Sequence, residues 1–204
     1  DKGEVYFQPD DAAWMTGAKF FPHARLNLTE NLLRGDDSAQ AILAMDELGQ
    51  VRTLTRRELK AKVARVAQGL RAAGVKPGDR VAGVQPNDID ALVALLATLS
   101  MGGTWTSCSP DFGEAAIVDR IGQVEPKVLF AAPHYRYGGK RHDISDRIRV
   151  VMGKLPSVTT LIVSGEGTVD PALNAIRQDE FGEQADLEFA PMPFDHPAYI
   201  LYTS

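Results

Sequence analysis

The chain has 204 residues, 44% of them hydrophobic and 24% charged, with a formal net charge of −5. This is the composition of an ordinary globular protein, and it argues against nucleic acid or an anionic membrane surface as a partner. The single cysteine, Cys108, excludes an internal disulfide framework and suits a reducing compartment, so we expect a cytoplasmic protein. The longest apolar stretch, residues 89–101, is interrupted by polar side chains and is too short to span a membrane.

The first 40 residues are expected to form an extended segment that packs on the surface of a domain. Aromatic residues are scattered along it without helical or strand periodicity: Tyr6, Phe7, Trp14, Phe20 and Phe21. Such rings carry enough apolar area to hold an extended chain against a surface. Residues 29–33 fit a short helix. The remaining residues, 41–204, are then assigned to one larger domain.

A hairpin and a long helix open that larger domain. Residues 41–45 and 51–54 read as two short strands joined by a turn. Thr55 and Glu58 follow with the spacing of a capping box, and apolar residues then recur at helical intervals until Gly74. We therefore predict a helix between Thr55 and Gly74 that turns its apolar face toward a core.

Strands and helices alternate over the rest of the chain. Strands are predicted at 80–84, 104–108, 128–131, 158–163 and 199–202, and helices at 89–99, 113–123 and 143–155. The Asp170-Pro171 pair predicts the start of one more short helix. This alternation is typical of an α/β fold with a doubly wound, mostly parallel sheet and helices on both faces. Residues 179–197 are rich in turn-forming and acidic residues and are the best candidate for a linker.

The last predicted strand raises the first functional hypothesis. Residues 198–202 are continuously apolar, which is the pattern of a strand buried on both faces. Thr203 and Ser204 would lie at its carboxyl end, where ligands bind in open α/β sheets. A glycine-rich turn would complete a phosphate cradle there, and none follows within the 204 residues. We therefore expect the sequence to be part of a longer protein.

A second candidate site is the loop expected at residues 134–142. A glycine pair, Gly138-Gly139, is surrounded by cations and tyrosines: Arg136, Lys140, Arg141, Tyr135 and Tyr137. In one interpretation the glycines let a phosphate approach the backbone while Arg136 and Lys140 converge on it and the tyrosines flank a planar ring. In the other interpretation the stretch is a solvated loop with stacked side chains.

The loop after the predicted strand 104–108 is the third candidate. Cys108 has no base nearby in the sequence to activate it as a nucleophile, so we expect a buried and inert thiol. The following residues, Ser109-Pro110-Asp111, lie at the carboxyl end of a central strand, where ligands dock. The histidines have no metal-ligand spacing and there is no second cysteine, so no metal site is predicted.

Several separate stretches of the sequence resemble one family. The stretches FFPHARLN (20–27) and ENLL (30–33) are similar to the entry segment of the short-chain acyl-CoA synthetases, and GVKPGDRV (74–81) resembles a turn of the acyl-adenylate-forming superfamily. The stretches SCSPDFG, DRIGQ, EPKVLF and YRYGGK, all between residues 107 and 140, resemble the acetoacetyl-CoA synthetases in particular. Acetyl- and propionyl-CoA synthetases are similar over the same span but usually carry a glycine-rich stretch where this chain has Ser109-Pro110-Asp111.

The resemblance implies that the chain is the N-terminal portion of a two-step ligase, with residues 41–204 forming part of its large adenylate-forming domain. In such an enzyme ATP and acetoacetate form acetoacetyl adenylate, with Mg²⁺ neutralising the phosphates, and coenzyme A then displaces AMP. Thr203 and Ser204 match the start of the family's phosphate loop. The region that lines the CoA nucleotide in the acetyl-CoA relatives is matched by Ser109, Pro110, Asp111, Arg136 and Lys140.

The rest of the phosphate loop, the acyl pocket and the mobile C-terminal domain with its lysine lie further along the chain in the family, so this portion alone is expected to be inactive, and no catalytic residue is assigned in it. Two alternatives stay open at this point. A near alternative is the same portion of an acetyl- or propionyl-CoA synthetase, against which the Ser109-Pro110-Asp111 stretch argues. It is also compatible with a stand-alone nucleotide- or CoA-binding module without catalysis. The sequence makes no prediction of the oligomeric state.

Overall fold

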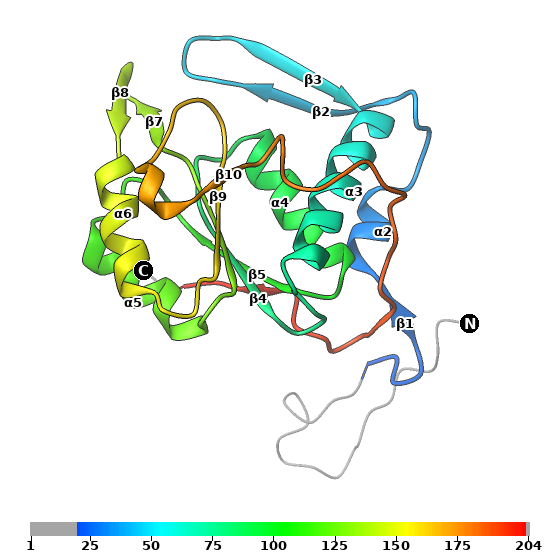
Figure 1. Ribbon diagram of the computed structural model, residues 1–204. Helices are drawn as coiled ribbons and strands as arrows, with labels where there is room; N and C mark the ends of the chain where they lie inside the picture. The colour runs from blue at the N-terminus through cyan, green and yellow to red at the C-terminus, as the bar shows by residue number, and fades with distance from the viewer. Residues whose placement is uncertain (1–19, 203–204) are drawn as a thin grey trace, which may run out of the picture.

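The structure is a computed structural model, and it describes residues 20–202 (Figure 1). Predictions for residues 1–19 and for Thr203 and Ser204 therefore lie outside the described residues. At the centre lies a parallel sheet of six strands in the order β10-β9-β6-β4-β5-β12. These strands are β4 (Arg80–Val84), β5 (Thr104–Cys108), β6 (Val128–Ala131), β9 (Thr160–Val163), β10 (Ile176–Arg177) and β12 (Tyr199–Ile200).

Helices cover both faces of this sheet. One face carries α3 (Arg56–Ala72) and α4 (Ile89–Ser100), and the other carries α5 (Glu114–Val124) and α6 (Ser145–Lys154) (Figure 1). Side chains alternate across a strand, so one strand serves both cores. In β4, Val81 packs with α3 and α4, whereas the next residue, Ala82, packs with α5 and α6. The prediction of a doubly wound α/β fold is confirmed.

The predicted capping box fixes the start of α3. The Thr55 hydroxyl accepts a hydrogen bond from the backbone N–H of Glu58 (3.3 Å), and the Glu58 carboxylate accepts one from the backbone N–H of Thr55 (2.7 Å). Backbone donors that a helix end leaves without partners are satisfied in this way. The apolar face that follows is buried, with Val63 and Leu70 fully inaccessible to solvent.

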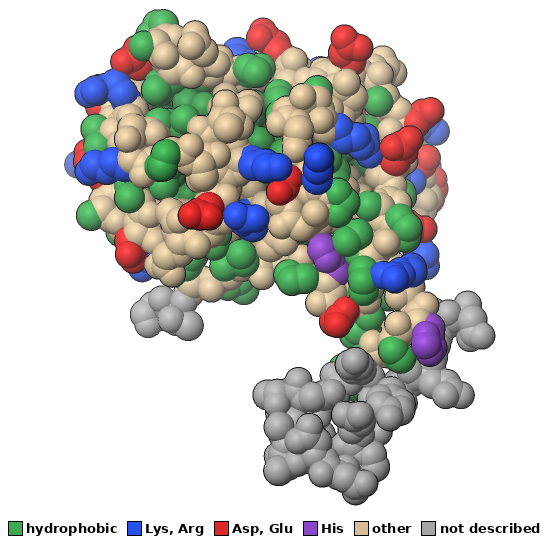
Figure 2. Space-filling view, turned by 60° about the horizontal axis from the view of Figure 1, so that its bottom comes forward, with side chains coloured by type: hydrophobic (Ala, Val, Ile, Leu, Met, Phe, Trp, Pro, Cys, Tyr) green, Lys and Arg blue, Asp and Glu red, His purple; other side chains and the backbone are tan. Residues whose placement is uncertain are grey.

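The short helix predicted after Asp170 is a single 3-10 turn, η1 (Pro171–Leu173). The Asp170 carboxylate caps it by accepting a hydrogen bond from the backbone N–H of Ala172 (2.9 Å). Within residues 20–202, no helix has the length and the apolar character needed to cross a membrane. The face of the molecule in Figure 2 carries acidic and basic side chains close together, so it has no extended patch of one sign.

Two antiparallel hairpins project from the sheet. The first, β2 (Gln40–Met45) and β3 (Val51–Thr55), is the predicted one. The second, β7 (His134–Tyr137) and β8 (Lys140–Asp143), occupies the stretch that was expected to be a loop. Its two-residue turn, Gly138-Gly139, has φ values of 59° and 75°, which glycine adopts without strain and which close a tight hairpin. Polar and charged side chains in this stretch concealed the strand pattern.

Residues just before the first hairpin pack against the last part of the described chain. β1 (Arg25–Leu26) pairs with β11 (Met192–Pro193), and α2 (Leu28–Leu32) lies against α4. Asn27 is almost completely buried between them. Its side-chain oxygen caps α2, and its side-chain NH₂ group donates to backbone carbonyls at the end of α4 and just before β11.

The interpretation of residues 179–197 as a linker is wrong. Phe181 is only 5% exposed, and its ring lies so close over Gly69 of α3 that a side chain at that position would clash with it. Leu187 and Phe189 pack against the same core. The segment runs across α4 and α3 before it reaches β11 (Figure 1). The acidic residues that suggested a linker are exposed between these apolar anchors.

The last strand also differs from its prediction, which was burial on both faces. β12 pairs only with β5 and forms one edge of the sheet. Tyr199 is 43% exposed and Leu201 is 83% exposed. An apolar run predicts a buried central strand only when neighbours flank and cover it, and an edge strand has one open side.

Candidate functional site

A parallel sheet of this type binds ligands at the carboxyl ends of its strands, here those of β4 and β5. We call this side of the sheet the ligand edge, as distinct from the edge strand β12. After β4 the chain crosses to α4 on one face, and after β5 it crosses to α5 on the opposite face. Adjacent parallel strands whose connections diverge in this way leave a crevice at their carboxyl ends. The loop after β5, the hairpin after β6 and the end of β12 all follow carboxyl ends of parallel strands, so they lie at this same edge.

The loop after β5 presents two polar side chains to solvent. Ser109 and Asp111 are exposed, whereas Pro110 between them is buried. Arg147, in the first turn of α6, holds this loop by donating from Nη1 to the carbonyls of Pro110 (2.8 Å) and Phe112 (3.0 Å). Sequence analysis missed Arg147, although a cation in the first turn of a helix is an unfavourable placement that calls for a specific partner.

Cys108 at the end of β5 is an inert thiol, as expected. It is 8% exposed, and burial raises its pKa to about 12, with Asp111 raising it further and Arg120 opposing them. The thiolate is the nucleophilic form of cysteine, and it is essentially absent at neutral pH when the pKa is this high. Cys108 is therefore part of the core and not of the chemistry.

The end of β12 is fixed by the side chain of the last described residue, Tyr202. Its hydroxyl donates a hydrogen bond to the backbone carbonyl of Arg120 in α5 (2.8 Å). The Thr106 hydroxyl of β5 lies 3.0 Å from the Tyr202 hydroxyl and 2.9 Å from the carbonyl of Ile200. The backbone that leads into Thr203 and Ser204 is thus anchored to both β5 and α5. The assignment of those two residues to a phosphate loop stays a prediction.

In the hairpin β7–β8 the register separates the two predicted cations. Arg136 lies directly opposite Arg141, and Tyr137 lies directly opposite Lys140. Opposite residues share a face and successive residues alternate, so Arg136 and Lys140 project from opposite faces. They do not converge on one phosphate, which corrects the geometry expected from the sequence. Arg141, which was not singled out as a site residue, is the cation that shares a face with Arg136.

The histidines of the hairpin support these two faces in different ways. Burial and the nearby Arg141 lower the pKa of His134 below its usual value, with the charges of Glu166 and Asp143 opposing them. A neutral imidazole then accepts a hydrogen bond at Nδ1 from Nη2 of Arg141 (3.1 Å). On the other face the rings of Tyr135 and His142 are stacked, with centroids 5.0 Å apart. The stacked side chains of the second interpretation are therefore present on one face only.

A buried polar chain at the same edge of the sheet has no counterpart in the sequence analysis. Gln85, directly after β4, donates from Nε2 to the hydroxyl of Ser164, which donates to Oε1 of Gln178. Nε2 of Gln178 donates in turn to the backbone carbonyl of Asp90 in α4 (2.9 Å). This network connects the ends of β4 and β9 to α4. Its residues are far apart in the chain, so no local sequence pattern predicts it.

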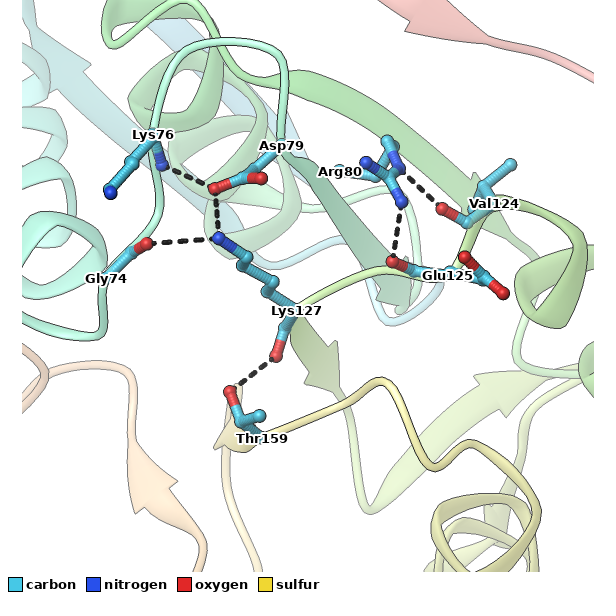
Figure 3. Close-up of polar contacts among 8 residues, drawn as sticks. All are labelled: Gly74, Lys76, Asp79, Arg80, Val124, Glu125, Lys127 and Thr159. Carbon is cyan, nitrogen blue, oxygen red and sulfur yellow. Dashed lines mark hydrogen bonds and ion pairs between the residues drawn. The ribbon is translucent and has the colours of Figure 1, made fainter.

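Two of the stretches that carry the family resemblance meet at the opposite edge, where β4 and β6 begin (Figure 3). The Asp79 carboxylate accepts a hydrogen bond from the backbone N–H of Lys76 (2.7 Å) and forms an ion pair with Lys127 Nζ (2.6 Å). Lys127 Nζ also donates to the carbonyl of Gly74 (3.4 Å). These contacts hold the turn before β4 against the start of β6.

Arg80 adds further contacts at the start of β4 (Figure 3). Its guanidinium donates to the carbonyls of Val124 (2.6 Å) and Glu125 (3.1 Å), which end α5, and the Thr159 hydroxyl donates to the carbonyl of Lys127 (3.2 Å). The motifs at 74–81 and 125–130 are therefore scaffold. They position the strands but lie at the amino ends, away from the ligand edge.

A cavity of about 200 Å³ also lies away from the ligand edge. It is formed between β1, β11 and the turn that precedes β5, and its lining is mostly apolar, with Leu26, Met192 and Phe194 among the lining residues. His196 borders it, with Nε2 at 2.7 Å from the carbonyl oxygen of Gly102. Within residues 20–202, none of the predicted site residues lines this cavity.

The fold is that of an α/β protein with loops after the carboxyl ends of its central strands, the position at which such sheets bind ligands. Residues 34–204 match the family described as AMP-binding enzymes, and the chain belongs to this family. It is 41% identical over 200 residues to the acetoacetyl-coenzyme A synthetase of Rhizobium meliloti, covering 95% of this chain and 31% of the relative. It is 37% identical to the malonamoyl-CoA synthetase of Penicillium aethiopicum, covering 96% and 30% respectively.

The solved acetoacetyl-CoA synthetase from Streptomyces lividans has the same fold over this region. Its TM-score is 0.86 at 40% sequence identity, covering 98% of this chain and 30% of that structure. The resemblance to acetoacetyl-CoA synthetases that the motifs indicated is confirmed. The chain spans about three tenths of the length of the curated relatives that it matches.

Proposed function

We propose that these residues belong to an ATP-dependent acid–thiol ligase that converts acetoacetate to acetoacetyl-CoA. The observation that carries the proposal is similarity to acetoacetyl-CoA synthetases over nearly the whole chain, including the loops at the ligand edge. The 204 residues alone are not expected to catalyse the reaction, because they correspond to less than a third of such an enzyme. The other short-chain acyl-CoA synthetases and a stand-alone binding module are less well supported by this similarity.

The two steps of such a ligase overcome the low reactivity of a carboxylate toward a thiol. A carboxylate is a poor electrophile, so its oxygen first attacks the α-phosphorus of ATP and expels pyrophosphate. The acyl adenylate then has a good leaving group, and the thiolate of coenzyme A attacks the acyl carbon and releases AMP. Magnesium would arrive with the ATP phosphates, since Mg²⁺ is commonly held by one or two carboxylates together with the substrate's phosphates. A cytoplasmic location would suit these substrates and the free thiol of Cys108.

Within this chain we assign two tasks. Thr203 and Ser204 would begin the loop that binds the ATP phosphates. Ser109, Pro110, Asp111, Arg136 and Lys140 would lie along the nucleotide of coenzyme A, as the resemblance implies.

The two faces of the hairpin β7–β8 are not equivalent for this task. Arg136 and Arg141 are exposed, lie directly opposite each other and form no ion pair with any carboxylate of residues 20–202. Like charges in directly opposite positions destabilise a hairpin, and an anion between them would relieve the repulsion. We therefore assign the stronger phosphate contact to the Arg136 face, and Lys140 a weaker, longer-range one.

A second acid fits the same proposal. Malonamate differs from acetoacetate by an amide NH₂ in place of the terminal methyl group, so the two acids have nearly the same shape. One of the similar proteins is named a malonamoyl-CoA synthetase. The substrate class we propose is therefore a three-carbon acid core with a carbonyl at carbon 3.

The complete gene product tests this proposal when it is supplied with ATP, Mg²⁺, coenzyme A and one acid at a time. Acetoacetyl-CoA should accumulate with acetoacetate, with AMP and pyrophosphate formed in equal amounts, as followed by mass spectrometry. A protein that forms ADP and phosphate, or no thioester, would contradict it.

A further inference from the structure

The turn of the hairpin β7–β8 already holds an anion from elsewhere in the chain. The backbone N–H of Gly138 donates to Oε1 of Glu47 (3.2 Å), and the backbone N–H of Gly139 donates to Oε2 of the same side chain (3.1 Å). Glu47 lies in the turn between β2 and β3, so the tips of the two hairpins meet (Figure 1). One carboxylate is thus bound at both oxygens by the two N–H groups of a glycine turn.

The geometry of this contact is that of an anion site. Both glycines have positive φ, so their N–H groups point outward from the turn together and form a concave pair of donors. The carboxylate that they hold makes no ion pair with a cation of residues 20–202. The Glu47 carboxylate is therefore held by backbone N–H groups and not by an ion pair.

The hairpin carries more positive charge than the single Glu47 carboxylate can neutralise. Arg136, Lys140 and Arg141 are exposed on the hairpin, and none of them takes part in an ion pair within the described residues. A phosphate monoester carries up to two negative charges and three acceptor oxygens, so it uses the N–H pair and at least one guanidinium at once. A carboxylate uses only the N–H pair.

The loop that presents Glu47 is itself well defined. The Asp46 carboxylate accepts hydrogen bonds from the backbone N–H groups of Leu48 and Gln50, both at 2.9 Å. Glu47 is exposed on this braced turn, so its side chain reaches the glycines from a fixed base and no packing around it has to be disrupted when it leaves them.

We propose that Glu47 holds the place of a ligand phosphate in the Gly138-Gly139 turn, and that a phosphorylated nucleotide must displace it to bind. The proposal rests on the proposed function only for the identity of the nucleotide, which is the 3′-phosphorylated adenosine of coenzyme A. An internal competitor lowers the apparent affinity by the fraction of molecules in which it occupies the site. It also raises selectivity, because a ligand must bring more charge than a carboxylate does.

The test measures binding of adenosine 3′,5′-bisphosphate to the complete gene product by calorimetry, with ATP as a second probe. Glu47→Ala frees both N–H groups and should tighten binding by about three- to ten-fold, and Glu47→Gln should tighten it less because its amide oxygen still accepts one bond. The matched control is Glu166→Gln. Glu166 is exposed and close enough to the hairpin to influence His134, so this variant removes the same charge without touching the turn.

Tightening with Glu47→Ala and none with the control supports displacement, and the probe that responds identifies which nucleotide brings the phosphate. Unchanged or weaker binding of both probes in Glu47→Ala, or no binding in any version, overturns the proposal and leaves Glu47 as a brace between hairpins. Thioester formation is measured separately. A protein that shows the displacement but makes no acetoacetyl-CoA would refute the proposed function and not this inference.

Discussion

Single charged side chains hold the two edges of the sheet, and Arg147 does so at the ligand edge. A single guanidinium nitrogen, Nη1, donates to the carbonyls of both Pro110 and Phe112, so it fixes the loop that carries Ser109 and Asp111. Hydrogen bonds to charged groups contribute more than neutral ones, and carbonyls left without a donor in a partly buried site are costly.

Arg147→Ala is expected to lower the free energy of unfolding by about 2 kcal/mol, because two charge-assisted hydrogen bonds are lost at once. Arg147→Lys should restore only part of this loss, since one ammonium can donate to both carbonyls but the lysine side chain is shorter. The matched control is Arg149→Ala on the same helix, whose ion pairs are long and exposed. Urea denaturation decides: equal stability of the Arg147→Ala and Arg149→Ala variants would contradict this role.

At the opposite edge, Asp79 gives the molecule a specific dependence on pH. Burial raises the pKa of Asp79, but the hydrogen bonds from Lys127 and from the Lys76 backbone, with the Lys127 charge, lower it more, so its pKa lies below the usual value. A carboxyl whose pKa is lowered by folding stabilises the protein above its unfolded pKa, about 3.9. That stability is lost as the pH falls through the folded pKa.

Asp79→Asn should therefore lower the free energy of unfolding by about 1 kcal/mol at pH 7, a modest value because Lys127 is 41% exposed and screened by solvent. The asparagine oxygen still accepts the Lys76 N–H, so the variant isolates the ion pair. In urea titrations the difference between the two proteins should persist at pH 5 and shrink as the pH falls below the unfolded pKa, about 3.9, toward the lowest pH at which both proteins stay folded. A difference that stays constant down to that pH would show that the ion pair does not carry it.

Among the secondary-structure elements, the hairpin β7–β8 has the clearest functional consequence. We expect Arg136→Ala and Arg141→Ala each to raise the KM for coenzyme A by about ten-fold, or ~1.4 kcal/mol, because both lie on one face. Lys140→Ala on the opposite face should change it by less than about three-fold. The adenylation half-reaction does not involve coenzyme A and should be unaffected in all three variants.

Separate assays of the two half-reactions distinguish binding from folding. Equal losses in adenylation and in thioester formation would indicate a structural defect. A larger effect of Lys140→Ala than of Arg136→Ala would assign the phosphate to the other face.

The sequence predicted the elements whose side chains are apolar and buried. The strand at 128–131 is apolar throughout, and every one of its residues is buried, so its type and bounds were recognisable. The hairpin at 134–143 was missed because its strands are polar and short and lie largely at the surface, so the glycine pair of its turn is the one feature of the sequence that indicates it. Residues 179–197 were misread because their apolar anchors are separated by acidic residues.

The candidate site was predictable in place but not in detail. The loop at 109–111 follows a strand in a parallel sheet, so its position at the ligand edge follows from the topology. The face on which Arg136 projects depends on the register of a hairpin that the sequence did not reveal. The contacts of Arg147 and of Glu47 join residues 35 to 92 positions apart, and no local pattern encodes such pairs.

At the scale of the whole molecule, alternation of strands and helices predicted a parallel, doubly wound sheet but not the order of its strands. That order places β4 between β5 and β6 and creates the divergent connections on which the ligand edge depends. The sheet, its edge loops and the family membership together support the central proposal, which is that the complete protein adenylates a 3-oxo acid.

The most direct test is acetoacetate-dependent exchange of labelled pyrophosphate into ATP by the complete gene product, measured without coenzyme A. Exchange should depend on acetoacetate or malonamate and should be at least about ten-fold slower with acetate, since a single missing polar contact in a pocket costs ~1.4 kcal/mol or more. Exchange that is equally fast with acetate, or absent with every acid while ATP still binds, would contradict the claim.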